Sequence, residues 1–285
     1  MIEADIIEDS ISDAGIRLTT FQVKFHRFVL PEHNTHRAFS RNFSSSRAIP
    51  TAKLIEQVRT DAAKPVHWGA NEPGMQAKGE LKQLQKVRVE SLWQEAALTA
   101  ADIAEKMAAE GAHKQIVNRL IEPYLYVNGV VTSTEWANFF ELRAHPDAQP
   151  EIQALAYAML SAFEDSEPKV LKMGEWHLPY VKQDERSHPF LALPENKLLL
   201  SKISAARCCR VSYLKNDGTK ANISEDLALC ERLVGARPLH SSPFEHQATP
   251  DEMSPVKGVA KWNNKELHGN FVGWCQFRKY IEQSM

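Results

Sequence analysis

Residues 18–47, which read LTTFQVKFHRFVLPEHNTHRAFSRNFSSSR, decide how the rest of the chain is interpreted. The run from Leu18 to Leu30 mixes β-branched and aromatic residues with partial alternation and ends at Pro31, which predicts one extended strand. The segment that follows is rich in serine and arginine up to Pro50. Hydroxyls, backbone N–H groups and a bidentate guanidinium bind phosphate well, so this cluster is a candidate phosphate site. A solvated polar turn would have the same composition.

The overall composition limits the class of protein. The chain has 285 residues, 43% of them hydrophobic, and 34 Lys+Arg against 36 Asp+Glu give a net charge of −2. This balance argues against binding of polyanions by bulk charge. No apolar run approaches the roughly 18 residues of a membrane span, and the first residues are acidic, so we expect a soluble protein of the bacterial or virus-infected host cytoplasm.

The cysteines do not predict disulfides or zinc. They are too few and too irregularly spaced for a disulfide framework or a paired C-x-x-C site, and we expect reduced core thiols. The four positions are Cys208, Cys209, Cys230 and Cys275.

Apolar spacing predicts four helical segments. Residues 81–110 are rich in helix formers with apolar positions three and four apart, so we expect one long helix or two consecutive ones there. A second helix is expected to begin at Thr132, where T-S-T-E has capping-box spacing, and to continue through WANFFELRA. A third begins at Pro150, which suits a first helical turn, and residues 224–235 form a short fourth.

These elements predict an α+β fold that is rich in helix, with a small, mostly antiparallel sheet. Strands are expected near the beginning of the chain and around Ser212. Residues 1–255 would form one domain. Residues 256–285 are too aromatic for a free tail, so we expect an extension that packs on the body or on a partner subunit.

Arg143 is the clearest single candidate for chemistry. It follows Trp136, Phe139 and Phe140 by seven, four and three residues, so helical geometry places its guanidinium beside an apolar face. A cation in that position needs an anion. The anion is either a bound ligand or a carboxylate across a helix packing or subunit interface.

Motifs for metals and dinucleotides are weak or absent. LHSSPFEHQ contains His240, Glu245 and His246, but H-x5-H across a proline is not a recognised ligand spacing. His33 and His36 form another weak signature, H-N-T-H. We therefore predict no metal, and the sequence has neither a P-loop nor a G-x-G-x-x-G fingerprint.

Three segments together resemble the flavin-dependent thymidylate synthase family. The triplet 35–37, seven residues and then 45–47 resemble its R-H-R-x7-S hallmark, and residues 138–152 resemble N-F-x-x-L-R followed by A-Q-x-E-I. A third match, ISAARCCRVSY at 203–213 with LHSSPFEH at 239–246, would precede the other two in the family. The order here implies a divergent, circularly permuted member, which a protein tolerates when its termini lie close together.

The resemblance implies a role for individual residues. The implied catalytic residues are Arg143, beside the pyrimidine ring, and His240, near the flavin and folate. The implied nucleotide-binding residues are Ser45, Ser46, Arg47, Arg119, Arg143 and Glu32. The implied flavin-proximal residues are His36, Arg37, Asn42, Asn138, Ser242 and Glu245.

Four positions depart from the family pattern. Thr35 replaces the first arginine of R-H-R, and Asp147 replaces a histidine. Glu32 replaces a glutamine and Phe43 replaces a glutamate, both at nucleotide-contacting positions. The base, the sugar or the final product can therefore differ from those of the family.

The implied reaction moves a one-carbon unit from methylenetetrahydrofolate, through reduced FAD, to C5 of dUMP and gives dTMP, with NADPH as a candidate reductant. Water attack would instead give a 5-hydroxymethyl nucleotide from dUMP or dCMP. The family forms homotetramers with shared sites, in which Arg119 would come from a neighbouring subunit. The alternatives are a nucleic-acid-binding module, which the net charge disfavours, and an inactive relative that keeps only the fold.

Overall fold

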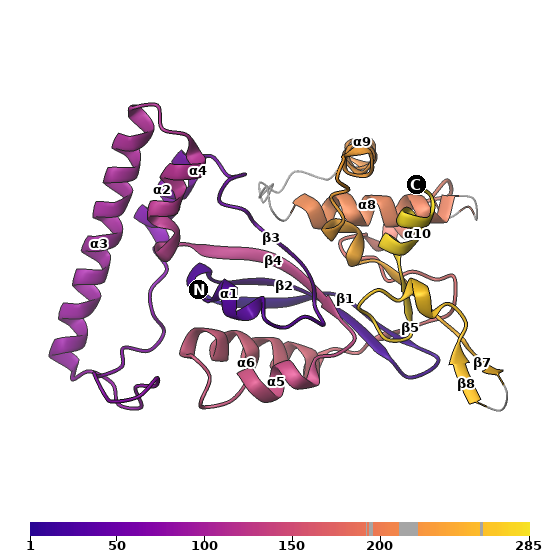
Figure 1. Ribbon diagram of the computed structural model, residues 1–285, viewed down its shortest axis with the longest axis horizontal. Coiled ribbons are helices and arrows are strands. Elements are labelled where there is room, and N and C mark those ends of the chain that lie inside the picture. Colours follow the sequence, from indigo (N-terminus) through magenta and orange to yellow (C-terminus); the bar gives the residue numbers. More distant parts are fainter. Residues whose placement is uncertain (192, 194–195, 211–221, 257–258) are drawn as a thin grey trace.

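A five-stranded sheet forms the centre of the protein in the computed structural model, which describes residues 1–191, 193, 196–210, 222–256 and 259–285 (Figure 1). The strand order is β3-β4-β2-β1-β5, and all neighbours are antiparallel except β1 and β5. The strands are β1 Glu3–Ser12, β2 Arg17–His26, β3 Ser40–Phe43, β4 Tyr126–Ser133 and β5 Lys169–Leu171. The predicted α+β class with a small, mostly antiparallel sheet is confirmed.

One face of the sheet carries the main core. Alternate residues of β2, namely Phe21, Val23 and Phe25, point to the same side and are buried against two helices. These helices are α5 Ala137–Arg143 and α6 Pro150–Asp165, which lie together along the sheet in Figure 1. Helix α5 packs Phe139 and Phe140 on this core, and it ends at Arg143.

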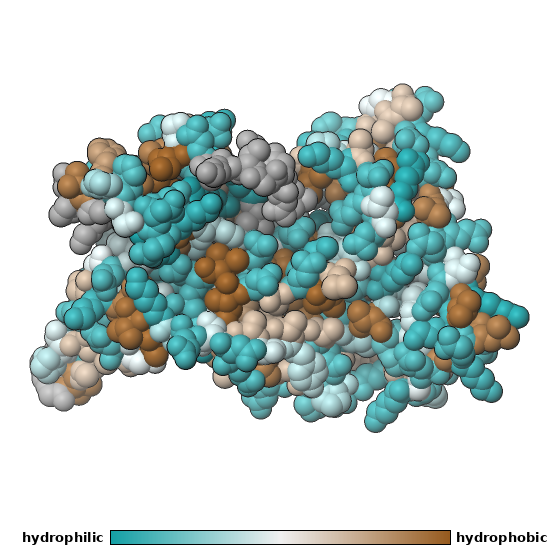
Figure 2. Space-filling view, turned by 180° about the vertical axis from the view of Figure 1, so that it is seen from behind, coloured by the Kyte–Doolittle hydropathy of each residue, from teal (hydrophilic) through white to brown (hydrophobic). Residues whose placement is uncertain are grey.

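A second helical body lies at the far end of the sheet. It consists of α2 Thr51–Asp61, α3 Gln83–Ala109 and α4 Lys114–Ile121, with a core of its own. In α3, Ala97, Ala101 and Ala104 are buried, whereas Leu84 and Leu92 are more than half exposed. In Figure 2, which views the molecule from behind, this helix lies on the right-hand side, and brown residues are scattered among teal ones over the whole face.

The C-terminal part contains α7 Gln183–Arg186, α8 Lys197–Arg210, α9 Ile223–Gly235, the 3-10 turn η4 Ser242–Glu245 and α10 Phe277–Gln283. Its strands are β6 Ala248–Pro250, β7 Met253–Val256, β8 Val259–Trp262 and β9 Trp274–Gln276. β9 pairs with β6, and Trp274 is fully buried. The end of the chain therefore packs on the body.

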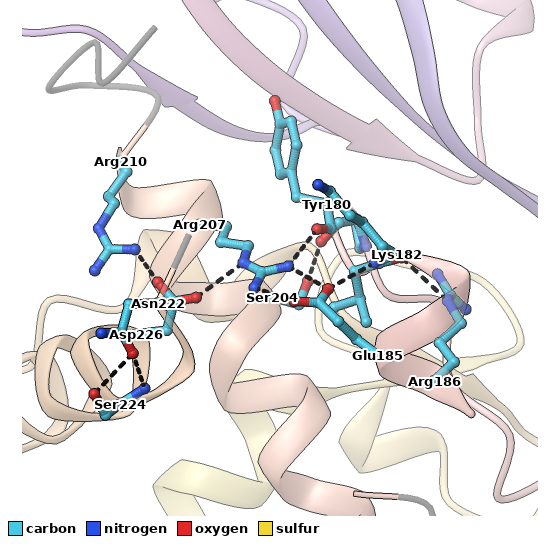
Figure 3. Close-up of polar contacts among 12 residues, drawn as sticks. Tyr180, Lys182, Glu185, Arg186, Ser204, Arg207, Arg210, Asn222, Ser224 and Asp226 are labelled. Carbon is cyan, nitrogen blue, oxygen red and sulfur yellow. Dashed lines mark hydrogen bonds and ion pairs between the residues drawn. The ribbon is translucent and has the colours of Figure 1, made fainter. Parts of the chain in front are cut away.

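Buried charges hold α7, α8 and α9 together (Figure 3). The Arg207 guanidinium donates to both carboxylate oxygens of Glu185 at 2.6 Å, to Asp226 Oδ2 at 2.9 Å and to the Tyr180 carbonyl at 2.8 Å. Arg210 also pairs with Asp226. Since Asp226 has no exposed surface, these bonds are what makes its charge tolerable.

Most predicted elements are confirmed. The helices expected at 81–110, from Pro150 and at 224–235 appear as α3, α6 and α9. The strand expected over 18–30 ends at His26, where the chain turns into a 3-10 segment, Arg27–Val29, and then α1 Leu30–His33 with Pro31 in its first turn. The cysteines are buried and reduced.

The predicted helix start at Thr132 is wrong. Thr132 lies in β4, where its hydroxyl shares hydrogen bonds with Thr20 Oγ1 at 2.7 Å and His246 Nδ1 at 2.8 Å. Tertiary partners on the sheet thus outweigh the local capping signal, and the helix begins at Ala137. The strand expected around Ser212 lies outside the described residues.

No helix in the described part of the chain combines the length and apolar character that crossing a membrane requires.

Candidate functional site

A cavity of about 430 Å³ opens between the loop after α1 and the outer face of α5. Five residues that the sequence singled out line it, namely Thr35, His36, Arg37, Asn138 and Arg143. They come from two segments about one hundred residues apart in the chain. The fold therefore brings the R-H-R-like triplet and the L-R motif to one site.

Arg143 is held at the cavity wall by two partners. Its Nε donates to His36 Nε2 at 3.1 Å, and its Nη1 forms an ion pair with Glu32. The Arg143 side chain keeps 20% of its surface exposed and that of Glu32 keeps 28%. The anion that the sequence required beside Arg143 is thus a carboxylate of the same chain, and part of the guanidinium still faces the cavity.

His36 is neutral in this arrangement. Its Nε2 accepts from the guanidinium, which places its own proton on Nδ1. Burial, together with the positive charges of Arg143 and Arg41, lowers its pKa to about 4. Its ring also stacks on Phe39 and meets the edge of Phe139, so its orientation is fixed.

The serine-rich segment is anchored by residues that the motif did not reveal. Ser46 Oγ donates to Glu122 Oε1 at 2.5 Å, and Asn118 Nδ2 donates to the Ser46 carbonyl at 2.7 Å. Ser45 is half-buried and Arg47 is exposed. Glu122 and Asn118 lie more than seventy residues away in sequence, so no local spacing could have indicated them.

A third group of contacts joins β3, α8 and η4, which are far apart in the chain. Asn42 Nδ2 on β3 donates to the Cys208 carbonyl of α8 at 2.7 Å, and Ser242 Oγ of η4 donates to Asn42 Oδ1 at 3.4 Å. Glu245 forms an ion pair with Arg278. The strand of the serine motif, the A-A-R helix and the P-F-E-H turn therefore lie side by side.

Two predicted residues lie apart from these groups. His240 and Arg119 are exposed, and their side chains make no hydrogen bond with the part of the chain that the structure describes. The Asn42, Ser242 and Glu245 group does not line the Arg143 cavity either. A single chain therefore assembles the predicted site only in part.

Asp251, His268 and Cys275 form a buried cluster, with potential ligand atoms within 4.8 Å of one another. The atoms are already engaged: Asp251 Oδ2 accepts from His268 Nε2 at 2.8 Å and from Asn264 N at 2.9 Å. The other ring nitrogen of His268 accepts from Gly273 N at 3.3 Å. These bonds give the cluster a structural role, closing the base of the β7–β8 hairpin.

A family of known proteins matches the part of the chain that forms the arginine-lined cavity. The family model described as thymidylate synthase complementing protein matches residues 17–169, just over half of the chain. The chain therefore belongs to this family, the flavin-dependent thymidylate synthases that its motifs resemble. The A-A-R helix and the P-F-E-H turn lie beyond the matched residues.

Among solved structures, the chain is similar to the crystal structure of a UMP/dUMP methylase, PolB from Streptomyces cacaoi, bound with 5-Br UMP. The sequences are 18% identical, the match covers 57% of this chain and 88% of that chain, and the TM-score is 0.46. No curated protein matches the chain.

Proposed function

We propose that this protein transfers a one-carbon unit to C5 of a pyrimidine deoxynucleotide. The observation that carries the proposal is the cavity with Arg143 in its wall, within the residues that match the family. Arg143 lines this cavity, and its Nη2 makes no hydrogen bond to any residue that the structure describes. The N–H groups of Nη2 are suited to a carbonyl oxygen of a pyrimidine ring, which is neutral before reaction and gains negative charge during it.

Arg143 would act by electrostatics. Its position is fixed before the ligand arrives, because Glu32 binds its Nη1 and His36 binds its Nε. A preorganised donor of this kind typically contributes about 3–4 kcal/mol to transition-state stabilisation. Neutral His36 adds no charge that would repel a second cation, so Arg37 can share the cavity.

FAD fits the donor set around this cavity. Arg37 and Asn138 are exposed at its rim, where a guanidinium and an amide can bind the polar edge of an isoalloxazine ring. When bound, FAD would carry the one-carbon unit, with methylenetetrahydrofolate as donor and NADPH as reductant. Asn42, Ser242 and Glu245, which lie outside this cavity, would contact a part of the flavin that extends beyond it.

We further propose that the complete site forms in a homotetramer. Helix α3 is apolar on more than one side, since Ala97 and Ala101 face the core while Leu84, Leu92 and Ile103 are exposed. Exposed apolar side chains that gather on one element can mark a contact surface for another subunit. Assembly through α3 would let Arg47 and Arg119, both exposed, serve the cavity of a neighbouring subunit.

The contacts between β3, α8 and η4 support circular permutation. Asn42 joins the Cys208 carbonyl and Ser242, although about two hundred residues separate Asn42 from Ser242 in the chain. In a permuted member of the family these contacts would be kept while the order of the segments changes. Residues 1–255 would then be one permuted domain, with 256–285 as its extension.

Product analysis tests the proposed function. The purified protein, supplied with FAD, NADPH, methylenetetrahydrofolate and either dUMP or dCMP, is expected to give a nucleotide heavier by a methyl or hydroxymethyl group. Mass spectrometry separates the two products. A colourless protein that forms neither product and binds oligonucleotides with strong salt dependence would instead support the nucleic-acid-binding alternative.

A further inference from the structure

Arg41 holds the loop that lines the cavity and keeps one edge of its guanidinium unbonded. It lies on β3, and its Nη1 donates to the carbonyls of Asn34 and His36, each at 2.9 Å. Its Nε and Nη2 make no hydrogen bond to any residue that the structure describes. The side chain is half-buried, so this cation is oriented by the fold and still keeps part of its surface exposed.

The unbonded edge is the one that binds an anion through two oxygens at once. A guanidinium forms such a pair side-on, through Nε and Nη2. Arg17 does so in this chain, donating from Nε to Asp9 Oδ1 at 3.0 Å and from Nη2 to Asp9 Oδ2 at 2.6 Å. Burial lowers the pKa of Arg41 and the charge of Glu245 raises it in part, but Glu245 is itself paired with Arg278. The side-on edge of Arg41 therefore has room for an anion from outside the described chain.

The two carbonyls that Arg41 binds belong to the residues on either side of Thr35. At this position the family pattern has the first arginine of R-H-R, whereas this chain has a threonine. The Thr35 hydroxyl donates to the Glu32 carbonyl at 2.7 Å and carries no charge. The Arg41 guanidinium thus lies next to the backbone of the position from which the arginine of the family would project.

We propose that Arg41 supplies the guanidinium that is missing at position 35 and binds a phosphate group of FAD. This inference rests on the proposed function, in which FAD lies against this loop. The phosphates are the only charged groups of oxidised FAD, and a guanidinium fork matches two of their oxygens. The surroundings of Arg41 favour the flavin over the nucleotide as the source of the phosphate, because His36, Asn42 and Glu245 are all implied flavin-proximal residues.

The position of Arg41 relative to the cavity agrees with this role. Thr35 and His36 line the cavity, whereas Arg41 does not. In FAD the ribityl chain separates the phosphates from the isoalloxazine ring. A residue that adjoins the cavity wall without lining the cavity is therefore suited to the phosphates and not to the ring.

The test compares the dissociation constants of FAD and riboflavin, of which only FAD carries phosphates, by flavin fluorescence on the full-length protein freed of bound flavin. Arg41→Gln keeps an amide that can donate to one loop carbonyl but removes the charged fork. It is expected to weaken FAD binding by about 10- to 100-fold, as when a hydrogen bond to a charged group is lost, and riboflavin binding by less than about 2-fold. The dissociation constant of dUMP should not change.

Two further variants sharpen the comparison. The matched control is Arg232→Gln, which removes the same charge from an exposed position on α9 and should leave all three constants unchanged. Thr35→Arg in the Arg41→Gln background restores a guanidinium at the position of the family pattern and should recover most of the lost FAD affinity. Absence of recovery would overturn the claim that one arginine stands in for the other.

The remaining outcomes separate this inference from the function on which it rests. Equal losses for FAD and riboflavin in Arg41→Gln would overturn it, because Arg41 would then act only by holding the loop. Weaker dUMP binding with unchanged FAD binding would also overturn it and assign the guanidinium to the nucleotide phosphate. A wild type that binds FAD but forms no nucleotide product would contradict the proposed function alone. Failure of the wild type to bind any flavin would contradict both.

Discussion

Two arginines, Arg143 and Arg207, lie in segments that resemble motifs of the family, yet the fold uses them in opposite ways. Arg207 makes four hydrogen bonds, to Glu185, Asp226 and Tyr180, and is only 8% exposed (Figure 3). Arg143 makes two and lines a cavity. The N–H groups of Arg207 are mostly bonded within the fold, whereas Arg143 is held in place by two bonds and keeps donors that a ligand can use.

The difference shows how a structural arginine can be told from a ligand-binding one. A guanidinium has five N–H groups, and a buried network stabilises a fold only when nearly all of them are satisfied. A binding site needs the reverse, a cation that is oriented but not saturated. The number of donors already bonded, together with an adjoining cavity, separates the two roles.

The largest effect is expected at Arg207. Arg207→Ala would leave the Glu185 and Asp226 carboxylates without their main partner, and removing one member of a buried ion pair typically costs about 3–5 kcal/mol. Urea denaturation would report the loss of unfolding free energy. Arg232→Ala, an exposed change on α9, is the control and should leave the midpoint unchanged. Equal urea midpoints for the two variants would show that Arg207 does not have this structural role.

Arg143→Ala should lower turnover strongly and change the stability of the protein little. Turnover is expected to fall by about 100- to 1,000-fold, as when a preorganised donor is lost. The unfolding free energy should change by less than about 1 kcal/mol, because the pair with Glu32 is partly exposed. Steady-state kinetics and urea denaturation on the same preparation measure both. A variant with full activity would refute the assignment of Arg143 to the site.

His33 tests whether buried polar atoms without hydrogen bonds affect stability when they do not line a cavity. Both its nitrogens are buried without a partner in the described structure, and its ring contacts Phe25, Phe39 and Phe139. Replacement by leucine removes an unsatisfied donor, so His33→Leu should stabilise the protein by about 1–3 kcal/mol. His188→Leu, at an exposed site, is the control. A destabilised His33→Leu protein would indicate that the ring has a packing role that leucine cannot fill.

The same substitution should weaken acid denaturation. Burial lowers the pKa of His33 to about 3, so the unfolded chain binds a proton below about pH 6.5 that the folded chain binds only near pH 3. More protons are then bound in the unfolded state, and stability falls as the pH is lowered through this window. His33→Leu should flatten that fall between pH 6.5 and pH 4.

The smallest effect is expected at Arg59. It pairs with Asp102 at 2.8 Å and Glu105 at 2.8 Å across α2 and α3, but the carboxylates are mostly exposed. Water and salt screen such pairs, so Arg59→Ala should leave the urea midpoint unchanged within error. A clear loss of stability would show that exposure is a poor guide to the role of an arginine in this protein.

Local patterns gave good predictions where one element decides its own structure. The α6 helix and the strand from Leu18 were predictable because their apolar spacing agrees with their burial, and α3 because it is rich in strong helix formers. The capping-box pattern at Thr132 failed because the hydroxyl found partners on neighbouring elements instead. Long-range competition of this kind leaves no trace in a short window of sequence.

The sequence alone determined the class of fold and the family, because both depend on residue types at fixed spacing along the chain. Only the tertiary structure decided that Glu32 faces Arg143, that Glu122 binds Ser46 and that Asn42 meets Ser242. These pairs join residues that are distant in the chain, and their charges and hydroxyls acquire a role only when folding removes water from between them. The role of each motif residue therefore depends on how many of its hydrogen-bond donors and acceptors already have partners in the folded chain.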